Sequence, residues 1–157
     1  ACRSHCIARV VSPPCANISR RGSDPPAERA GMDDHDVQAA LQRHWAASDA
    51  NDFAVEHAMY AEHAMLEYRQ SGERIRGRQR IQASRMAQPS QKRFTVRRTL
   101  GGGALWITEF VITYDAQPIH VVSIMEFEGG QVVRETQYFG APFEPSPSRS
   151  QWVEQMR

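Results

Sequence analysis

Four strand-like runs follow one another in the second half of the chain, with no helical pattern between them. Each is rich in β-branched or aromatic residues, and they span residues 93–100, 105–114, 119–127 and 131–139. Turns rich in glycine or proline separate them at residues 101–103, 115–118 and 129–130. Strands joined by such short turns pair antiparallel, so this half of the chain predicts an antiparallel meander.

A helical period precedes the strands. Three apolar residues recur at about the 3.6-residue spacing of a helix, namely Val37, Leu41 and Trp45. We therefore expect a first helix that Asp34 or Asp36 caps at its N-terminus.

The segment between this helix and the meander holds three further short elements and one more helix. Asp52 is placed to cap a second helix, and a strand over residues 64–70 and a return strand over residues 73–76 follow. A third helix over residues 78–86 ends before Pro89. The sequence therefore predicts the order α-α-β-β-α-β-β-β-β.

This order predicts one α+β domain over residues 32–157. Helices that come first and a meander that comes last form two layers. We expect a conical, strongly curved antiparallel sheet with three helices on its concave face. A sheet curled around helices leaves a pocket for a small, mostly apolar molecule.

Residues 1–31 differ from the rest in composition. They hold five arginines against two acidic residues, a charge of +3, whereas residues 32–157 hold 14 basic and 16 acidic residues, a charge of −2. All three cysteines, Cys2, Cys6 and Cys15, lie in this first segment, with no disulfide or zinc spacing. We expect a leader or upstream-translated segment without its own fold, and Met32 as the natural first residue.

The bulk properties of residues 32–157 exclude several classes of protein. A mildly acidic domain lacks the basic face of a nucleic-acid binder. No apolar run approaches the roughly 20 residues that cross a membrane, so a cytoplasmic protein is expected. His57, Glu62 and His63 are spaced so that they fall on a helix end and a loop, where three ligands would not converge on one ion. No metal site is therefore predicted.

Three motifs together resemble the SnoaL-like family of the nuclear transport factor 2 superfamily, which has a ketosteroid isomerase and polyketide cyclase-like fold. They are YAEHAMLEY, SGERIRG and GGQVVRETQYF, and the likeness covers residues 37–139. The resemblance implies a cystatin-like cone, chemistry without a cofactor, and a homodimer through the convex face of the sheet. The family includes both enzymes and non-catalytic domains, so the fold alone does not decide function.

Ketosteroid isomerase permits a residue-by-residue comparison. Its catalytic base falls on Tyr68, its oxyanion-hole tyrosine on His44, and its protonated aspartate on Ser123. None of the three residue types matches. Because that isomerase needs a carboxylate base and two acids, the resemblance does not extend to its activity.

The same alignment and the alternation of strand side chains predict which residues line the pocket. The predicted ligand-binding residues are Tyr68, Trp106, Phe110, Tyr114, Ser123, Met125 and Gln137. On the last strand Val133 and Glu135 are expected to face inward as well. Val111, Ile124 and Tyr138 are expected on the convex face, where they would form the dimer surface.

Glu135 and His44 are the predicted catalytic residues. A carboxylate in an apolar cone is expected to have a raised pKa, and His44 beside it would complete an acid/base pair. The two structural alternatives for Glu135 are a buried, hydrogen-bonded carboxylate and a surface residue. The function is then acid/base catalysis of the isomerase, dehydratase or cyclase type; the alternative is a non-catalytic small-molecule-binding or dimerisation domain.

Overall fold

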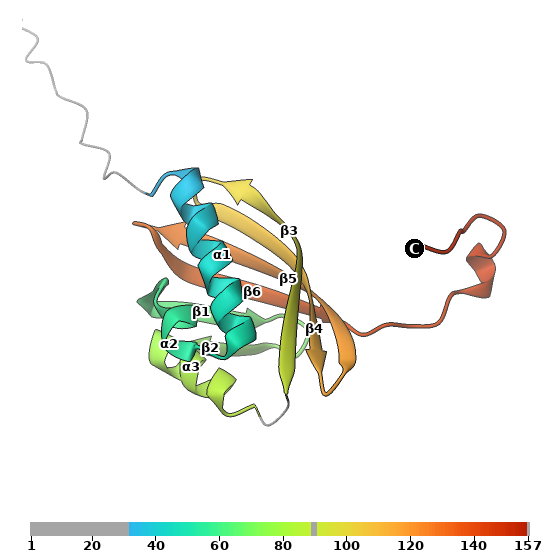
Figure 1. Ribbon diagram of the computed structural model, residues 1–157, viewed down its shortest axis with the longest axis horizontal. Helices are drawn as coiled ribbons and strands as arrows, with labels where there is room; N and C mark the ends of the chain where they lie inside the picture. Colours follow the sequence, from blue (N-terminus) through green and yellow to red (C-terminus); the bar gives the residue numbers. More distant parts are fainter. Residues whose placement is uncertain (1–31, 89–90, 157) are drawn as a thin grey trace, which may run out of the picture.

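The computed structural model describes residues 32–88 and 91–156 (Figure 1). Its elements are α1 (Asp34–Ala50), α2 (Phe53–His57), β1 (Tyr60–Tyr68), β2 (Glu73–Arg76), α3 (Arg78–Met86), β3 (Lys92–Gly102), β4 (Leu105–Tyr114), β5 (Gln117–Glu128), β6 (Gln131–Gly140) and the short 3-10 helix η1 (Pro147–Arg149). No helix in the described part of the chain is long and apolar enough to span a membrane. The predicted leader and its cysteines lie outside the described residues.

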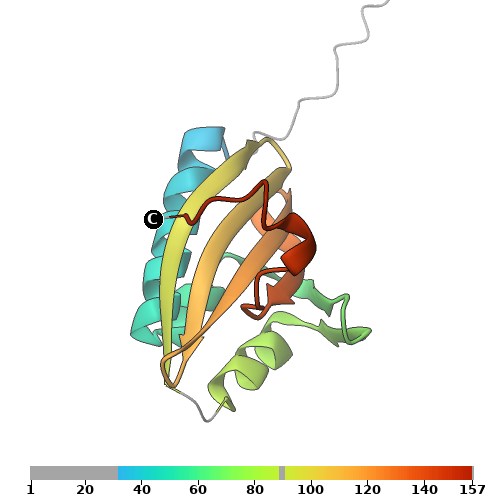
Figure 2. The same cartoon turned by 90° about the vertical axis from the view of Figure 1, so that its right-hand side faces the viewer.

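The six strands form one sheet in the order β2-β1-β6-β5-β4-β3. The α+β class is confirmed, and Figures 1 and 2 show α1 along the concave side of the curved sheet. One strand pair departs from the antiparallel prediction, because β1 and β6 run parallel. β6 pairs with β5 on one side, as the meander predicts, and on its other side with β1, which precedes α3 in the chain.

Aspartates begin the first two helices and tie α1 to the sheet. The N-cap of α1 is Asp33, one residue before the prediction, and its Oδ1 accepts a hydrogen bond from the Asp36 amide at 2.8 Å. Asp52 caps α2 as predicted, through the Val55 amide at 3.2 Å. Asp34 accepts from the Gly103 amide at 2.7 Å, which fastens α1 to the turn between β3 and β4.

The core lies between the helices and the concave face, and the predicted alternation holds on β4 and β5. Their inward residues are buried: Trp106, Thr108, Phe110, Ile112, Val121, Ser123, Met125 and Phe127. On β6 the prediction for Val133 is wrong. A bulge opposite Glu126 and Phe127 shifts the register there, so that Val132 is fully buried and Val133 is only partly covered.

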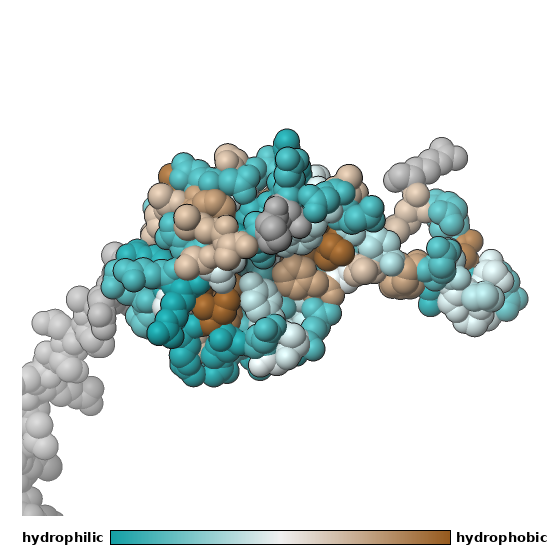
Figure 3. All heavy atoms as spheres, turned by 90° about the horizontal axis from the view of Figure 1, so that it is seen from below, coloured by the Kyte–Doolittle hydropathy of each residue, from teal (hydrophilic) through white to brown (hydrophobic). Residues whose placement is uncertain are grey.

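A C-terminal segment follows β6 and contains the helical turn η1. Figure 3 shows this segment standing away from the body of the domain. Phe143 and Trp152 on it are 82% and 75% exposed. The segment therefore adds no side chain to the core.

Candidate functional site

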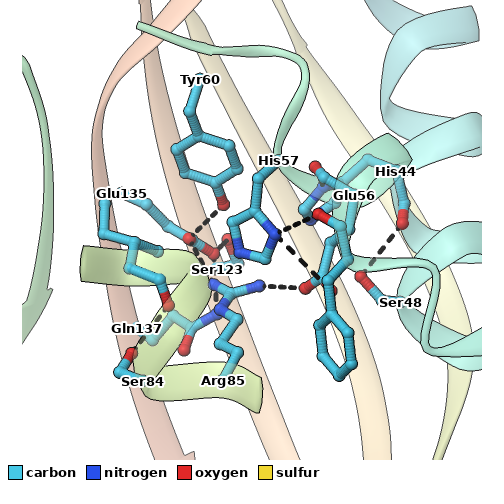
Figure 4. Close-up of polar contacts among 12 residues, drawn as sticks. His44, Ser48, Glu56, His57, Tyr60, Ser84, Arg85, Ser123, Glu135 and Gln137 are labelled. Carbon is cyan, nitrogen blue, oxygen red and sulfur yellow. Dashed lines mark hydrogen bonds and ion pairs between the residues drawn. The ribbon is translucent and has the colours of Figure 1, made fainter. Parts of the chain in front are cut away.

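A buried cluster of three charges occupies the interior of the cone. Arg85 of α3 lies between two carboxylates, with Nη1 at 2.6 Å from Glu56 Oε1 and Nη2 at 2.8 Å from Glu135 Oε2 (Figure 4). All three residues are buried. The cluster joins α3, α2 and β6, which are distant in sequence.

Sequence reasoning missed Arg85. Arginines on helices usually lie in solvent, and α3 contains two others, Arg78 and Arg80, with Arg76 just before the helix. The available signal was spacing: Arg85 follows the fully buried Ile81 by four residues, and side chains four apart share one helix face.

Glu135 faces the interior, as predicted, but every oxygen of its carboxylate is engaged. Oε2 accepts from the Tyr60 hydroxyl at 2.5 Å and from Arg85, and Oε1 accepts from Ser123 Oγ and Gln137 Nε2, both at 2.7 Å. The predicted raised pKa is wrong. Burial raises the pKa of Glu135, but Arg85, His44 and the hydrogen bonds lower it more. The carboxylate is thus ionised and holds Arg85 in place.

His44 does not pair with Glu135, because Arg85 occupies that position. Its Nδ1 lies 2.7 Å from the backbone oxygen of Glu56, and a carbonyl can only accept, so Nδ1 carries the proton. Burial, together with the charge of Arg85, lowers the pKa of His44 to about 4. His44 is therefore a neutral interior residue, and it lines a separate groove between α1 and α2.

A small cavity opens beside the charge cluster, with a volume of about 30 Å³, which exceeds the roughly 10–15 Å³ that one water molecule needs. Ten residues line it: Tyr68, Arg85, Gln88, Lys92, Phe94, Phe110, Ile112, Tyr114, Gln137 and Phe139.

Four of the predicted ligand-binding residues line this cavity, namely Tyr68, Phe110, Tyr114 and Gln137. The other three, Trp106, Ser123 and Met125, are buried but do not line it. Glu135 is also absent from the lining. Arg85 and Lys92, which carry the charges of the wall, were not predicted.

An open groove continues from the cavity to the surface. It has a volume of about 510 Å³ and shares Tyr68, Gln88 and Phe139 with the cavity lining. Its other lining residues are Gln70, Ser71, Glu73, Ile75 and Ser84. The groove and the cavity together form the candidate site: an outer space for the body of a ligand and an inner end lined by polar groups.

One group of side chains lies close enough together to hold a metal ion in the described part of the chain. It consists of Asp33, His35 and Asp36, all exposed. Asp33 already caps α1, so this group is explained by helix capping.

Replacing Glu135 by Gln should destabilise the protein by about 3 kcal/mol. The change leaves Arg85 paired with one carboxylate only, and it puts an NH2 group, itself a donor, where one carboxylate oxygen accepted two hydrogen bonds. Urea unfolding of Glu135→Gln beside wild type measures the change. Glu126→Gln is the matched control, since Glu126 lies on the outer side of β5 and is half-exposed. Equal stability of both variants would contradict the structural role of the cluster.

Acid should destabilise the protein in two steps. The pKa of His44 is about 4 in the folded state against 6.5 in the unfolded chain, so the unfolded chain binds more protons between these values. The free energy of unfolding should therefore fall as the pH drops from 6.5 to 4, by about 3 kcal/mol from His44 alone. Glu56 and Glu135, whose pKa values are lowered, add a loss below pH 4.5.

Urea unfolding at several pH values tests this dependence. In His44→Asn an amide can replace the Nδ1 hydrogen bond without a titrating group, so the slope between pH 6.5 and 4 should shrink. His63→Asn, at an exposed position, is the control and should leave the slope unchanged. A wild-type stability that stays constant over this range would refute the assignment of neutral His44.

A model of the SnoaL-like domain matches residues 37–135 of the chain. No curated protein matches. Among solved structures, an NTF-2 like protein of unknown function from Burkholderia xenovorans LB400 is 51% identical, with a TM-score of 0.75, over 81% of this chain and 100% of that chain.

Two further solved structures extend the comparison. A protein from Kribbella flavida DSM 17836, provisionally named a ketosteroid isomerase, is 25% identical, with a TM-score of 0.72, over 77% of this chain and 90% of that one. An LEH-like epoxide hydrolase of M. tuberculosis is 21% identical, with a TM-score of 0.55, over 66% and 81% of the two chains. The latter likeness concerns the fold alone.

Proposed function

Since the chain belongs to the SnoaL-like domain family, with a nuclear transport factor 2-like fold, we propose that it binds a small organic molecule in the groove and cavity beside α3. The resemblance stated from the sequence is confirmed by the family match. The proposal concerns what the site does, which the fold leaves open.

The observation that supports binding is the composition of the cavity wall. Phe94, Phe110 and Phe139 provide aromatic surface, and polar groups of Tyr68 and Gln137 share the same lining. Burial raises the pKa of Tyr68 to about 12, so its hydroxyl remains a hydrogen-bond donor at neutral pH. Apolar walls with a few placed polar groups are typical of ligand sites.

The volumes suggest how a ligand lies in the site. The inner cavity, about 30 Å³, admits one small group, whereas the groove, about 510 Å³, accommodates a body of ten or so heavy atoms. We propose that the body lies against Tyr68, Ile75 and Phe139, and that one polar end reaches inward.

Binding without catalysis is favoured over the acid/base enzyme. Proton transfer needs a base within hydrogen-bond reach of the ligand. No Asp or Glu of the described residues lines the cavity, and Glu73 lies in the exposed outer groove rather than at the inner end. Glu135 is saturated by four donors, and His44 faces another groove. Catalysis of the isomerase, dehydratase or cyclase type is the second candidate, with Arg85 as a fixed cation that stabilises a developing oxyanion.

A fragment screen by ligand-observed NMR tests the proposed site. Neutral and anionic aromatic fragments should bind wild type, and Ser84→Phe should weaken their binding at least tenfold by filling the groove. Ala83→Phe, on the exposed side of the same helix, is the control and should bind normally. Absence of any binder would refute the function, and binders indifferent to Ser84→Phe would refute the site.

We also propose a homodimer through the convex face of the sheet. Leu100, Ile107 and Ile124 are cross-strand neighbours on this face. Leu100 is 57% and Ile107 is 38% exposed, and Tyr138, expected here from the sequence, is 42% exposed. An apolar row of this kind is seldom left bare on a monomer.

Sedimentation velocity tests the dimer. Wild type should sediment as a dimer at tens of micromolar, and Ile107→Asp should be monomeric because it places a charge in the middle of the row. Val55→Asp changes a valine on α2 that is at least as exposed as Ile107, and it should leave the dimer intact. A monomeric wild type would refute the interface.

A further inference from the structure

Lys92 is the single lysine of the chain, against 18 arginines. It lies at the start of β3 and is only 6% exposed. Its Nζ stands 4.9 Å from the centre of the Phe53 ring and 5.8 Å from that of Phe94. The amine is therefore held against aromatic faces at the wall of the cavity.

Lys92 differs from Arg85, the other cation of the wall, in its partners. Arg85 is neutralised by Glu56 and Glu135, whereas no carboxylate of the described residues lies within ion-pair distance of Lys92. Burial lowers the pKa of Lys92, and the more distant charge of Glu56 opposes this effect only in part. A buried ammonium is strongly unfavourable without a partner, so this position requires a reason.

The charge of the wall indicates which ligand would supply the partner. The ten lining residues include two cations and no Asp or Glu. A neutral ligand would leave the ammonium unpaired, and a cationic ligand would be repelled. An anionic group on the ligand would form a charge-assisted hydrogen bond with Nζ, which is about twice as strong as a neutral one.

We propose that the ligand is a small carboxylic acid, and that Lys92 binds its carboxylate at the inner end of the cavity. This inference rests on the proposed binding function and narrows it to one chemical class. A carboxylate is planar and compact, which suits a cavity of about 30 Å³. Gln137 and Tyr114 line the same cavity and offer further donors to its second oxygen.

The uniqueness of Lys92 makes a direct experiment available. Protein grown with isotope-labelled lysine gives a single lysine side-chain signal in NMR. We expect benzoate, cinnamate or hexanoate to shift this signal and at least one of them to bind tenfold more tightly than its matched amide.

Two variants separate charge from packing. Lys92→Met keeps the length and removes the charge, so the preference for acid over amide should vanish while amide binding persists. Lys92→Arg keeps the charge and should retain most of the preference. Circular dichroism at 25 °C tests whether each variant is folded. If a variant does not fold, the shift of the wild-type lysine signal on adding acid or amide still tests the proposal.

The outcomes also separate this inference from the proposed function. Equal binding of acids and amides would overturn the carboxylate assignment and leave the binding site standing. Binding of acids without a shift of the lysine signal, or with an unchanged preference in Lys92→Met, would assign the anion to another group. Failure of acids and amides alike to bind would overturn both.

Discussion

The ion pairs of Arg85 with Glu56 and Glu135 determine the interior of this domain. Taking three charges out of water costs several kcal/mol per ion unless each is paired and hydrogen-bonded. Tyr60, Ser123 and Gln137 complete the bonds of Glu135, which explains why polar side chains lie among Phe and Met on the inner face of the sheet. The cluster thereby connects α2 and α3 to the last strand.

Local patterns were sufficient to predict most elements, and long-range pairing was not. The bounds of β2, α3 and β4 agree with the runs read from the sequence. The parallel pairing of β1 with β6 joins strands far apart in the chain, and the bulge at Val133 depends on how β6 pairs with β5. Neither can be predicted from the spacing of apolar residues within one strand. Glu135 was correctly placed inward even though Val133 was not, because the bulge lies between them.

The predicted acid/base pair failed for an electrostatic reason. A lone carboxylate in an apolar cone would have a raised pKa, but the sign of the shift depends on the nearest charge as well as on burial. Arg85 supplies that charge. The sequence did not distinguish Arg85 from the neighbouring arginines on and before α3, which lie nearer to solvent. The neutral state of His44 follows first from its burial and then from the same cation, whose charge also lowers the pKa of the imidazole.

The same cluster explains why the inner end of a ligand would meet cations and not acids in the cavity, whereas the acid Glu73 lines only the outer groove. Two of the five N–H donors of Arg85 bond to carboxylates that lie behind the cavity wall, and the guanidinium itself lines the cavity. Both acids are thus turned away from the ligand, while Lys92 adds an unpaired positive charge at the wall. Around the cavity, the two carboxylates Glu56 and Glu135 stand against the two cations Arg85 and Lys92, so these four charges sum to zero, yet the wall that faces the cavity is positive. A fold that segregates its buried charges in this way can select an anion without carrying an excess of positive charge.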